Sequence, residues 1–223
     1  MNRPFRLWAI WVISICGSAF ALHLQAGETA IPNTMVKVVV AAEATDMPED
    51  SFGTKPRTFY RAGDTYGRTE EADDPAMKLH GLIIISEPDS WMINLTDKTG
   101  KHFKDPGPTF VMHMPVFALP NLPKIFYSLE FGREFEFFEK VSKKKKYPKT
   151  VNGMKFDSYA VGTGGYMVVV YTEPNKEVPL FAFLFKGNDV ILTIRYMEYK
   201  SGLSFDPALF KVPGGIKITE QTP

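Results

Sequence analysis

The sequence contains the run Val178-Pro-Leu-Phe-Ala-Phe-Leu-Phe-Lys186, the turn signal Gly187-Asn-Asp189 and the run Val190-Ile-Leu-Thr-Ile-Arg-Tyr-Met-Glu-Tyr199. Both runs are rich in Val, Ile, Phe and Tyr, which favour strands. The Gly/Asn/Asp turn between them is typical of a hairpin. This stretch therefore predicts two antiparallel strands in the last third of the chain.

The faces of these two strands are unusual. Side chains alternate along a strand, so Phe181, Phe183 and Phe185 share one face, while Ala182 and Leu184 share the other. An antiparallel sheet with one face in water normally alternates apolar with polar residues. Because both faces are apolar here, each needs cover from a helix, a second layer or a ligand.

Strand signals extend over most of the chain. Turn signals recur every ~8 to 12 residues, the spacing of a β-barrel or sandwich. The predicted strands outside the hairpin are Met35–Ala42, Arg57–Tyr60, Thr65–Thr69, Leu79–Ile85, Trp91–Leu95, Lys101–Lys104, Lys155–Val161 and Tyr166–Thr172.

Between the two blocks of strands the period changes to that of a helix. Leu122, Ile125, Phe126 and Leu129 fall at helical spacing, and the pattern repeats after Gly132. We expect one kinked helix or two short helices between about residues 122 and 142. Their aromatic stripe is most simply a core face.

The N-terminus has the layout of a secretory signal peptide. Arg3 and Arg6 precede an apolar run that ends in small residues near Ala21, and Ala26 offers a later cleavage site. The run is shorter than the ~20 residues that a membrane span needs. We expect residues 1–21 to be removed, with cleavage as late as residue 26, and the product to reach the periplasm across the inner membrane of a Gram-negative-type bacterium. A lipoprotein signal at Cys16 is disfavoured, because Ile15 stands where a small residue is usual.

Composition after cleavage excludes several classes of function. Of 26 basic residues, two lie in residues 1–21, which leaves 24 against 25 acidic residues. Nothing in this balance suggests binding of nucleic acid, which needs a clustered positive surface. The only cysteine is Cys16, so thiol catalysis and disulfides are not expected in the mature protein.

Two patterns resemble sites but are better explained by packing. The triplet Met112-His113-Met114 resembles a soft copper site, but alternation along a strand puts the methionines opposite the histidine, so core methionines are favoured. Gly162-Thr-Gly-Gly165 joins two predicted strands and lacks the helix that a phosphate loop needs. No Gly-x-Ser-x-Gly motif occurs. We expect no metal, no cofactor and no enzymatic activity.

Four consecutive lysines, Lys143–Lys146, follow the predicted helical segment. Cations suit the C-terminal end of a helix, so a solvated helix cap is the favoured interpretation. Docking on a membrane surface is the alternative.

A resemblance to a known family can be stated on three segments. The stretches Arg57–Arg68 and Asp89–Leu95 resemble early strands of the LolA/LolB-like superfamily of periplasmic lipoprotein carriers, and Leu203–Lys217 resembles its closing segment. The resemblance covers roughly residues 35–218. It implies a mainly β (α+β) fold, a curved, unclosed antiparallel β-barrel in one domain with a helical segment covering the concave face. Arg57, Arg61 and Arg68 are all candidates for the cavity arginine of the carriers.

The resemblance implies binding of lipid or another acyl-chain ligand, with a role in lipid or lipoprotein trafficking. Partners would be a lipid or a lipidated protein. We expect an apolar cavity between the sheet and the helical segment, lined by Trp91, Ile93, Phe126, Phe137, Phe138, Phe181, Phe183 and Phe185. The alternative is an interaction or assembly protein of the cell envelope that uses an apolar sheet face.

Overall fold

A computed structural model describes residues 31–44, 52–107 and 111–221. The predicted signal peptide, residues 1–21 with cleavage as late as residue 26, and Cys16 lie outside the described residues. No helix in the described part of the chain is long and apolar enough to cross a membrane.

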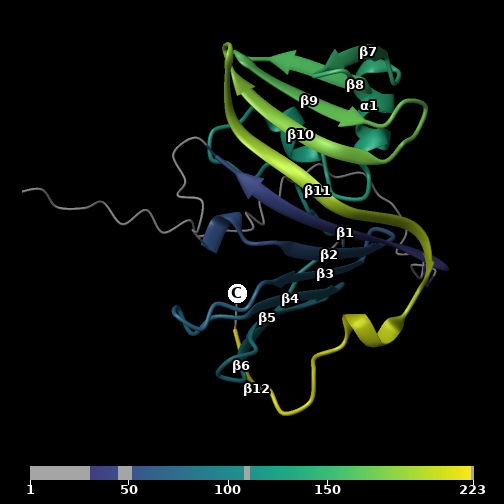
Figure 1. The fold of residues 1–223 in the computed structure, drawn as a ribbon. Coiled ribbons are helices and arrows are strands. Elements are labelled where there is room, and N and C mark those ends of the chain that lie inside the picture. The colour runs from purple at the N-terminus through teal and green to yellow at the C-terminus, as the bar shows by residue number, and fades with distance from the viewer. Residues whose placement is uncertain (1–30, 45–51, 108–110, 222–223) are drawn as a thin grey trace, which may run out of the picture.

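The described chain forms one curved, unclosed sheet of twelve strands with a single α-helix, so the predicted fold class is confirmed (Figure 1). The strand order is β12-β6-β5-β4-β3-β2-β1-β11-β10-β9-β8-β7, and only β12 is parallel to its neighbour. The elements are β1 Thr34–Glu43, η1 Phe52–Thr54, β2 Arg57–Ala62, β3 Tyr66–Glu71, β4 Gly81–Ser86, β5 Asp89–Asn94, β6 Thr99–Lys104, η2 Lys124–Ser128, α1 Glu134–Ser142, β7 Lys146–Val151, β8 Met154–Thr163, β9 Tyr166–Thr172, β10 Pro179–Lys186, β11 Asp189–Ser204, η3 Pro207–Phe210 and β12 Lys217–Glu220.

The predicted helical segment becomes two short helices. The first is the 3-10 turn η2, which ends at Ser128 and is followed by Leu129 in an extended conformation; the second is α1, and Gly132, at a φ of 81°, lies between them. A left-handed φ of this kind favours glycine. The break brings Phe131 onto Phe59 of β2 as a stacked pair, with ring centroids 4.3 Å apart.

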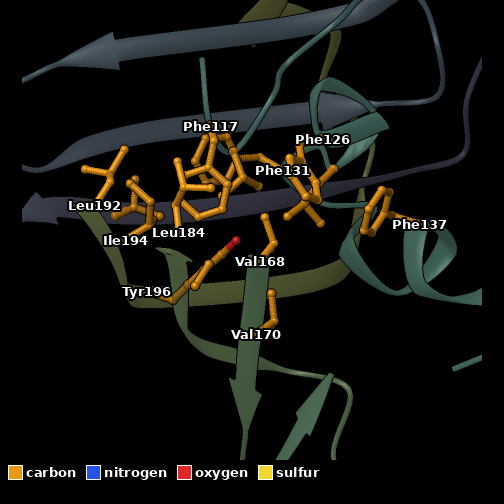
Figure 2. Close-up of a cluster of buried hydrophobic side chains, with 14 of the residues drawn as sticks. Phe117, Phe126, Phe131, Phe137, Val168, Val170, Leu184, Leu192, Ile194 and Tyr196 are labelled. Carbon is orange, nitrogen blue, oxygen red and sulfur yellow. The ribbon is translucent and has the colours of Figure 1, made fainter. Parts of the chain in front are cut away.

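The larger of two cores lies under the half of the sheet formed by the neighbouring strands β1, β11, β10, β9 and β8. Figure 2 shows Val168, Val170 and Leu184 of the sheet facing rings from η2, α1 and the segments before and after η2. Phe117, Phe126 and Phe138 have no exposed surface. The aromatic rings of the stripe are therefore core, as their helical spacing predicted, whereas Ile125, which shares that spacing, is 37% exposed.

The smaller core lies on the opposite face of the sheet, under β2 to β6. Leu82, Ile84 and Ile93 pack there against Phe210 and the chain from residue 203 to 218, which crosses this face before β12 pairs with β6. The two cores thus sit on opposite faces of one sheet. The first is covered by the middle of the chain and the second by its C-terminal segment.

Candidate functional site

The eight residues predicted to line one cavity lie in three separate places. Phe126, Phe137 and Phe138 belong to the larger core and are at most 3% exposed. These rings meet the sheet directly, because Ala182 and Leu184 of β10 are fully buried against them. The space between helix and sheet is therefore filled by the protein's own side chains.

Trp91 and Ile93 face the smaller core instead. In the register of β4 and β5, Ile93 lies opposite Leu82 and Trp91 opposite Ile84, both members of that core. Trp91 also stacks on His102 of β6, with ring centroids 5.0 Å apart. The prediction that Trp91 and Ile93 point toward the 122–142 segment is wrong, because the two halves of the sheet are covered on opposite faces.

Phe181, Phe183 and Phe185 were also predicted to point toward the helical segment, and this is wrong too. The inward positions of β10 are taken by Ala182 and Leu184. Rings from η2 and α1 already occupy the inner volume, so the strand presents its smaller side chains there. The three phenylalanines lie on the outer face and are partly exposed.

These phenylalanines form a continuous aromatic surface with two neighbours. Phe156 of β8 stacks on Tyr171 of β9 at 5.6 Å between ring centroids, and Tyr171 meets Phe183 edge-on at 5.2 Å. Phe181 and Phe185 lie 5.9 and 6.3 Å from Phe183. We call this surface the outer aromatic face: Phe156, Tyr171, Phe181, Phe183 and Phe185.

Cationic side chains border the outer aromatic face at both ends. Lys149 of β7 pairs across the sheet with Phe156, and Arg195 of β11 pairs with Phe181, so both cations lie on the same side as the rings. The Arg195 side chain is 50% exposed, and its Nε lies 3.7 Å from Glu43 Oε1. The arrangement can accept an apolar chain at its centre and an anionic group at either border.

A pocket of about 520 Å³ lies at the N-terminal end of α1. Its lining includes Phe135, Tyr199 and the buried carboxyl residue Glu134, with Arg133, Lys140 and Lys144 among the charged residues. The Glu134 carboxyl is fully buried and accepts hydrogen bonds from the Tyr196 hydroxyl at 2.9 Å and the Tyr199 hydroxyl at 3.3 Å. Burial raises the pKa of Glu134 to about 7.

A buried ion pair lies between β2 and the segment that precedes α1. Arg61 Nη1 is 2.6 Å from Glu130 Oε2, and both side chains are less than 10% exposed. His113 Nδ1 lies 2.7 Å from the other Glu130 oxygen. Burial acts to raise the pKa of Glu130, but the contacts with His113 and Arg61 outweigh it and hold that pKa below its usual value.

The three candidate cavity arginines therefore have different surroundings. Arg61 lies on the face of the larger core, paired with Glu130. Arg57 lies near Glu71, with 3.3 Å between Nε and Oε1. Arg68 faces the smaller core, where it donates to the Leu209 carbonyl and to Glu70. All three are held by the protein's own acceptors.

Met112 and Met114 are buried and His113 points outward, as the alternation predicted. Gly67 of β3 leaves room for the Met112 sulfur, because a Cβ there would lie only 2.1 Å from it. Within the described ranges, no group of three His, Cys, Asp or Glu residues could hold a metal ion.

The lysine run Lys143–Lys146 does more than cap the helix. Lys143 ends α1 in a left-handed conformation, with its backbone N–H directed to the last turn. Lys146 begins β7, an edge strand that the sequence patterns missed because it contains a proline and few apolar residues. The Lys144 and Lys146 ammonium groups form ion pairs with Glu177 and Asp157.

Comparison with known proteins finds matches among solved structures, at low sequence identity. No family model and no curated protein matches the sequence. An uncharacterised conserved protein from Thermus thermophilus has a TM-score of 0.48 at 9% identity, over 85% of this chain and 91% of that one. MucB has a TM-score of 0.45 at 9% identity, over 83% of this chain and 59% of that one. A domain described as an outer membrane lipoprotein-sorting protein domain, from Vibrio parahaemolyticus, has a TM-score of 0.33 at 12% identity, over 80% and 87%.

Proposed function

We propose that this protein binds acyl chains in the cell envelope without catalysis, and that the chains lie on the outer aromatic face. The ligand is a lipid or the lipid group of a lipidated protein, and trafficking of that ligand in the periplasm is the role that follows. The observation that supports this proposal is the run of five partly exposed aromatic rings in mutual contact across β8, β9 and β10.

The physical argument rests on burial and charge. Covering apolar surface contributes about 25 cal/mol per Å² removed from water, and contiguous exposed apolar patches on a soluble protein mark interaction sites. Lys149 and Arg195 at the borders suit the anionic headgroup of a phospholipid. An acyl chain with an anionic head thus matches both the centre of the surface and its borders.

The test uses protein secreted to the periplasm and purified without detergent. Lipids extracted from it are identified by mass spectrometry, for the wild type and for Phe183→Ser. Met92→Ser, which changes a side chain 50% exposed on β5, is the matched control. We expect lipid in the wild type and the control and a large loss in Phe183→Ser. Absence of lipid from the wild type, or equal lipid in all three proteins, would overturn the proposal.

The second candidate is an interaction or assembly protein of the envelope. The partial exposure of the same aromatic face favours it, because such a surface also suits a protein partner or a second copy. The purified protein distinguishes the two functions. A ligand-free, stable oligomer that Phe183→Ser converts to monomers supports assembly, whereas a lipid-loaded monomer supports acyl-chain binding.

A further inference from the structure

The chain from residue 143 to residue 156 is uniformly basic. It contains six lysines and no acidic residue, and the next acid is Asp157. The segment comprises the C-terminal cap of α1, the edge strand β7, a two-residue turn and the start of β8. In a protein whose charges nearly balance overall, this hairpin is a local concentration of positive charge.

Two of the six lysines are held by acidic partners. Lys144 Nζ lies 3.0 Å from Glu177, and Lys146 Nζ lies 2.9 Å from Asp157 and 3.1 Å from the Asn175 amide oxygen. The four others, in the part of the chain that the structure describes, have no acidic partner: Lys143, Lys145, Lys149 and Lys155. The charge of these four is available to an external anion.

The same hairpin exposes apolar side chains. Asn152 and Gly153 have φ angles of 50° and 79°, which makes the tight turn typical of a two-residue hairpin. Val151 and Met154 flank this turn as a cross-strand pair, and Met154 is 59% exposed. Tyr147 is also exposed, with the Lys145 ammonium 5.3 Å from its ring centroid.

Protection of a sheet edge accounts for only part of this arrangement. β7 is the last strand of the sheet, and lysines and a proline on such a strand hinder pairing with another chain. Pro148 and Lys149 fit that purpose. Val151 and Met154 do not, because exposed apolar residues at an edge increase the tendency to associate.

We propose that the β7–β8 hairpin docks on an anionic lipid bilayer. Lysines are attracted to a surface of anionic headgroups, and a tyrosine suits the interfacial region because its ring is apolar and its hydroxyl polar. Val151 and Met154 at the turn then enter the headgroup layer. The charge of the four lysines selects this partner, and Lys144 and Lys146 serve the fold instead. This surface meets the outer aromatic face at Lys149, which pairs with Phe156; the other three lysines, Val151 and Met154 are not part of that face.

The test measures binding to phosphatidylcholine vesicles with and without phosphatidylglycerol, using protein purified from the periplasm. The triple variant Lys143→Gln/Lys145→Gln/Lys155→Gln, which keeps Lys149, should bind the anionic vesicles about a hundredfold more weakly, since each lysine near the surface contributes roughly a fivefold factor in affinity. The matched control, Lys101→Gln/Lys104→Gln/Lys211→Gln, removes equal charge from exposed lysines outside the hairpin. It should bind nearly as the wild type does.

A second variant, Met154→Asp, tests the apolar residues at the turn and should also weaken binding to anionic vesicles. An unchanged melting temperature shows that each variant folds. The inference would be overturned if the wild type failed to bind anionic vesicles, or if the two triple variants lost binding equally. It would also be overturned if the protein captured an acidic protein but did not bind vesicles. Because the hairpin variants leave Phe183 intact, loss of vesicle binding with retained extractable lipid separates this inference from the proposed function.

Discussion

The Glu134 carboxyl is fully buried, which disfavours its ionised form, and the hydrogen bonds that Tyr196 and Tyr199 donate to it offset this only in part. Its pKa is raised from 4.5 to about 7, chiefly by burial. At a pH between these two pKa values, the Glu134 carboxyl is ionised in the unfolded chain but protonated in the folded protein. Stability from this group is therefore complete below pH 4.5 and is lost as the pH rises to about 7.

The change that tests this is Glu134→Gln, which keeps an oxygen acceptor for Tyr196 and removes the titration. We expect the stability of the variant relative to the wild type to increase as the pH rises from about 5 to about 8. Urea unfolding at the two pH values measures the difference. Glu136→Gln, at an exposed position in the same helix, is the control and should show little pH dependence. A Glu134→Gln difference that did not change with pH would contradict the assignment.

The buried ion pair between Arg61 and Glu130 is the basis of a second prediction at this scale. Arg61→Met leaves a buried carboxylate without its cation and should cost about 3–5 kcal/mol in unfolding free energy. The double variant Arg61→Met/Glu130→Leu removes both charges and should be more stable than the single one. Denaturant unfolding of the three proteins checks this. Glu173→Gln, from an exposed pair with Lys176, should cost at most about 1 kcal/mol.

Strand β10 shows what sequence patterns can and cannot predict about an element. Alternation of side chains separates its residues into two faces, and the flanking turns place its ends within a residue or two. Which face points inward depends on the neighbouring volume, which rings from η2 and α1 already fill. The same limit explains why the side predicted for Trp91 is wrong. Its cover is the C-terminal segment, more than a hundred residues away in the sequence.

The assignment of faces in β10 can be tested by two truncations. Leu184→Ala removes a fully buried side chain and should cost about 2–5 kcal/mol. Phe183→Ala should cost less than about 2 kcal/mol, although it removes more atoms, because part of that ring is already in water. Urea unfolding measures both values. A larger cost for Phe183→Ala would mean that the outer face is covered and would remove the proposed binding surface.

On the scale of the whole molecule, removal of the signal peptide determines the N-terminus of the mature protein. The layout from Arg3 to Ala21 predicts removal of the signal peptide. We expect the N-terminus of protein isolated from the periplasm to be near Leu22 or Gly27, as measured by N-terminal sequencing or intact mass. Recovery of residues 1–10 in the purified protein, or of a lipid on Cys16, would refute this.

The two cores share one sheet, and β11 joins them. This sixteen-residue strand packs Leu192, Ile194 and Tyr196 into the larger core and ends with Leu203 against the smaller one, while β1 pairs with it from Thr34 to Glu43. A substitution that destabilises one core should therefore also destabilise the other, because the paired strands β1 and β11 are continuous between them. We expect the described fold to unfold as one cooperative unit.

Trp91 makes this expectation measurable, because it packs against the smaller core and is the only tryptophan left after the predicted cleavage. Phe126→Ala creates a cavity in the larger core, on the other face of the sheet, and should cost about 3–5 kcal/mol. If the cores unfold together, Trp91 fluorescence and far-UV circular dichroism should report the same lowered urea midpoint. If Trp91 kept the wild-type midpoint while the circular dichroism transition moved, the halves would be independent. The single sheet would then be a geometric connection without energetic coupling between the cores.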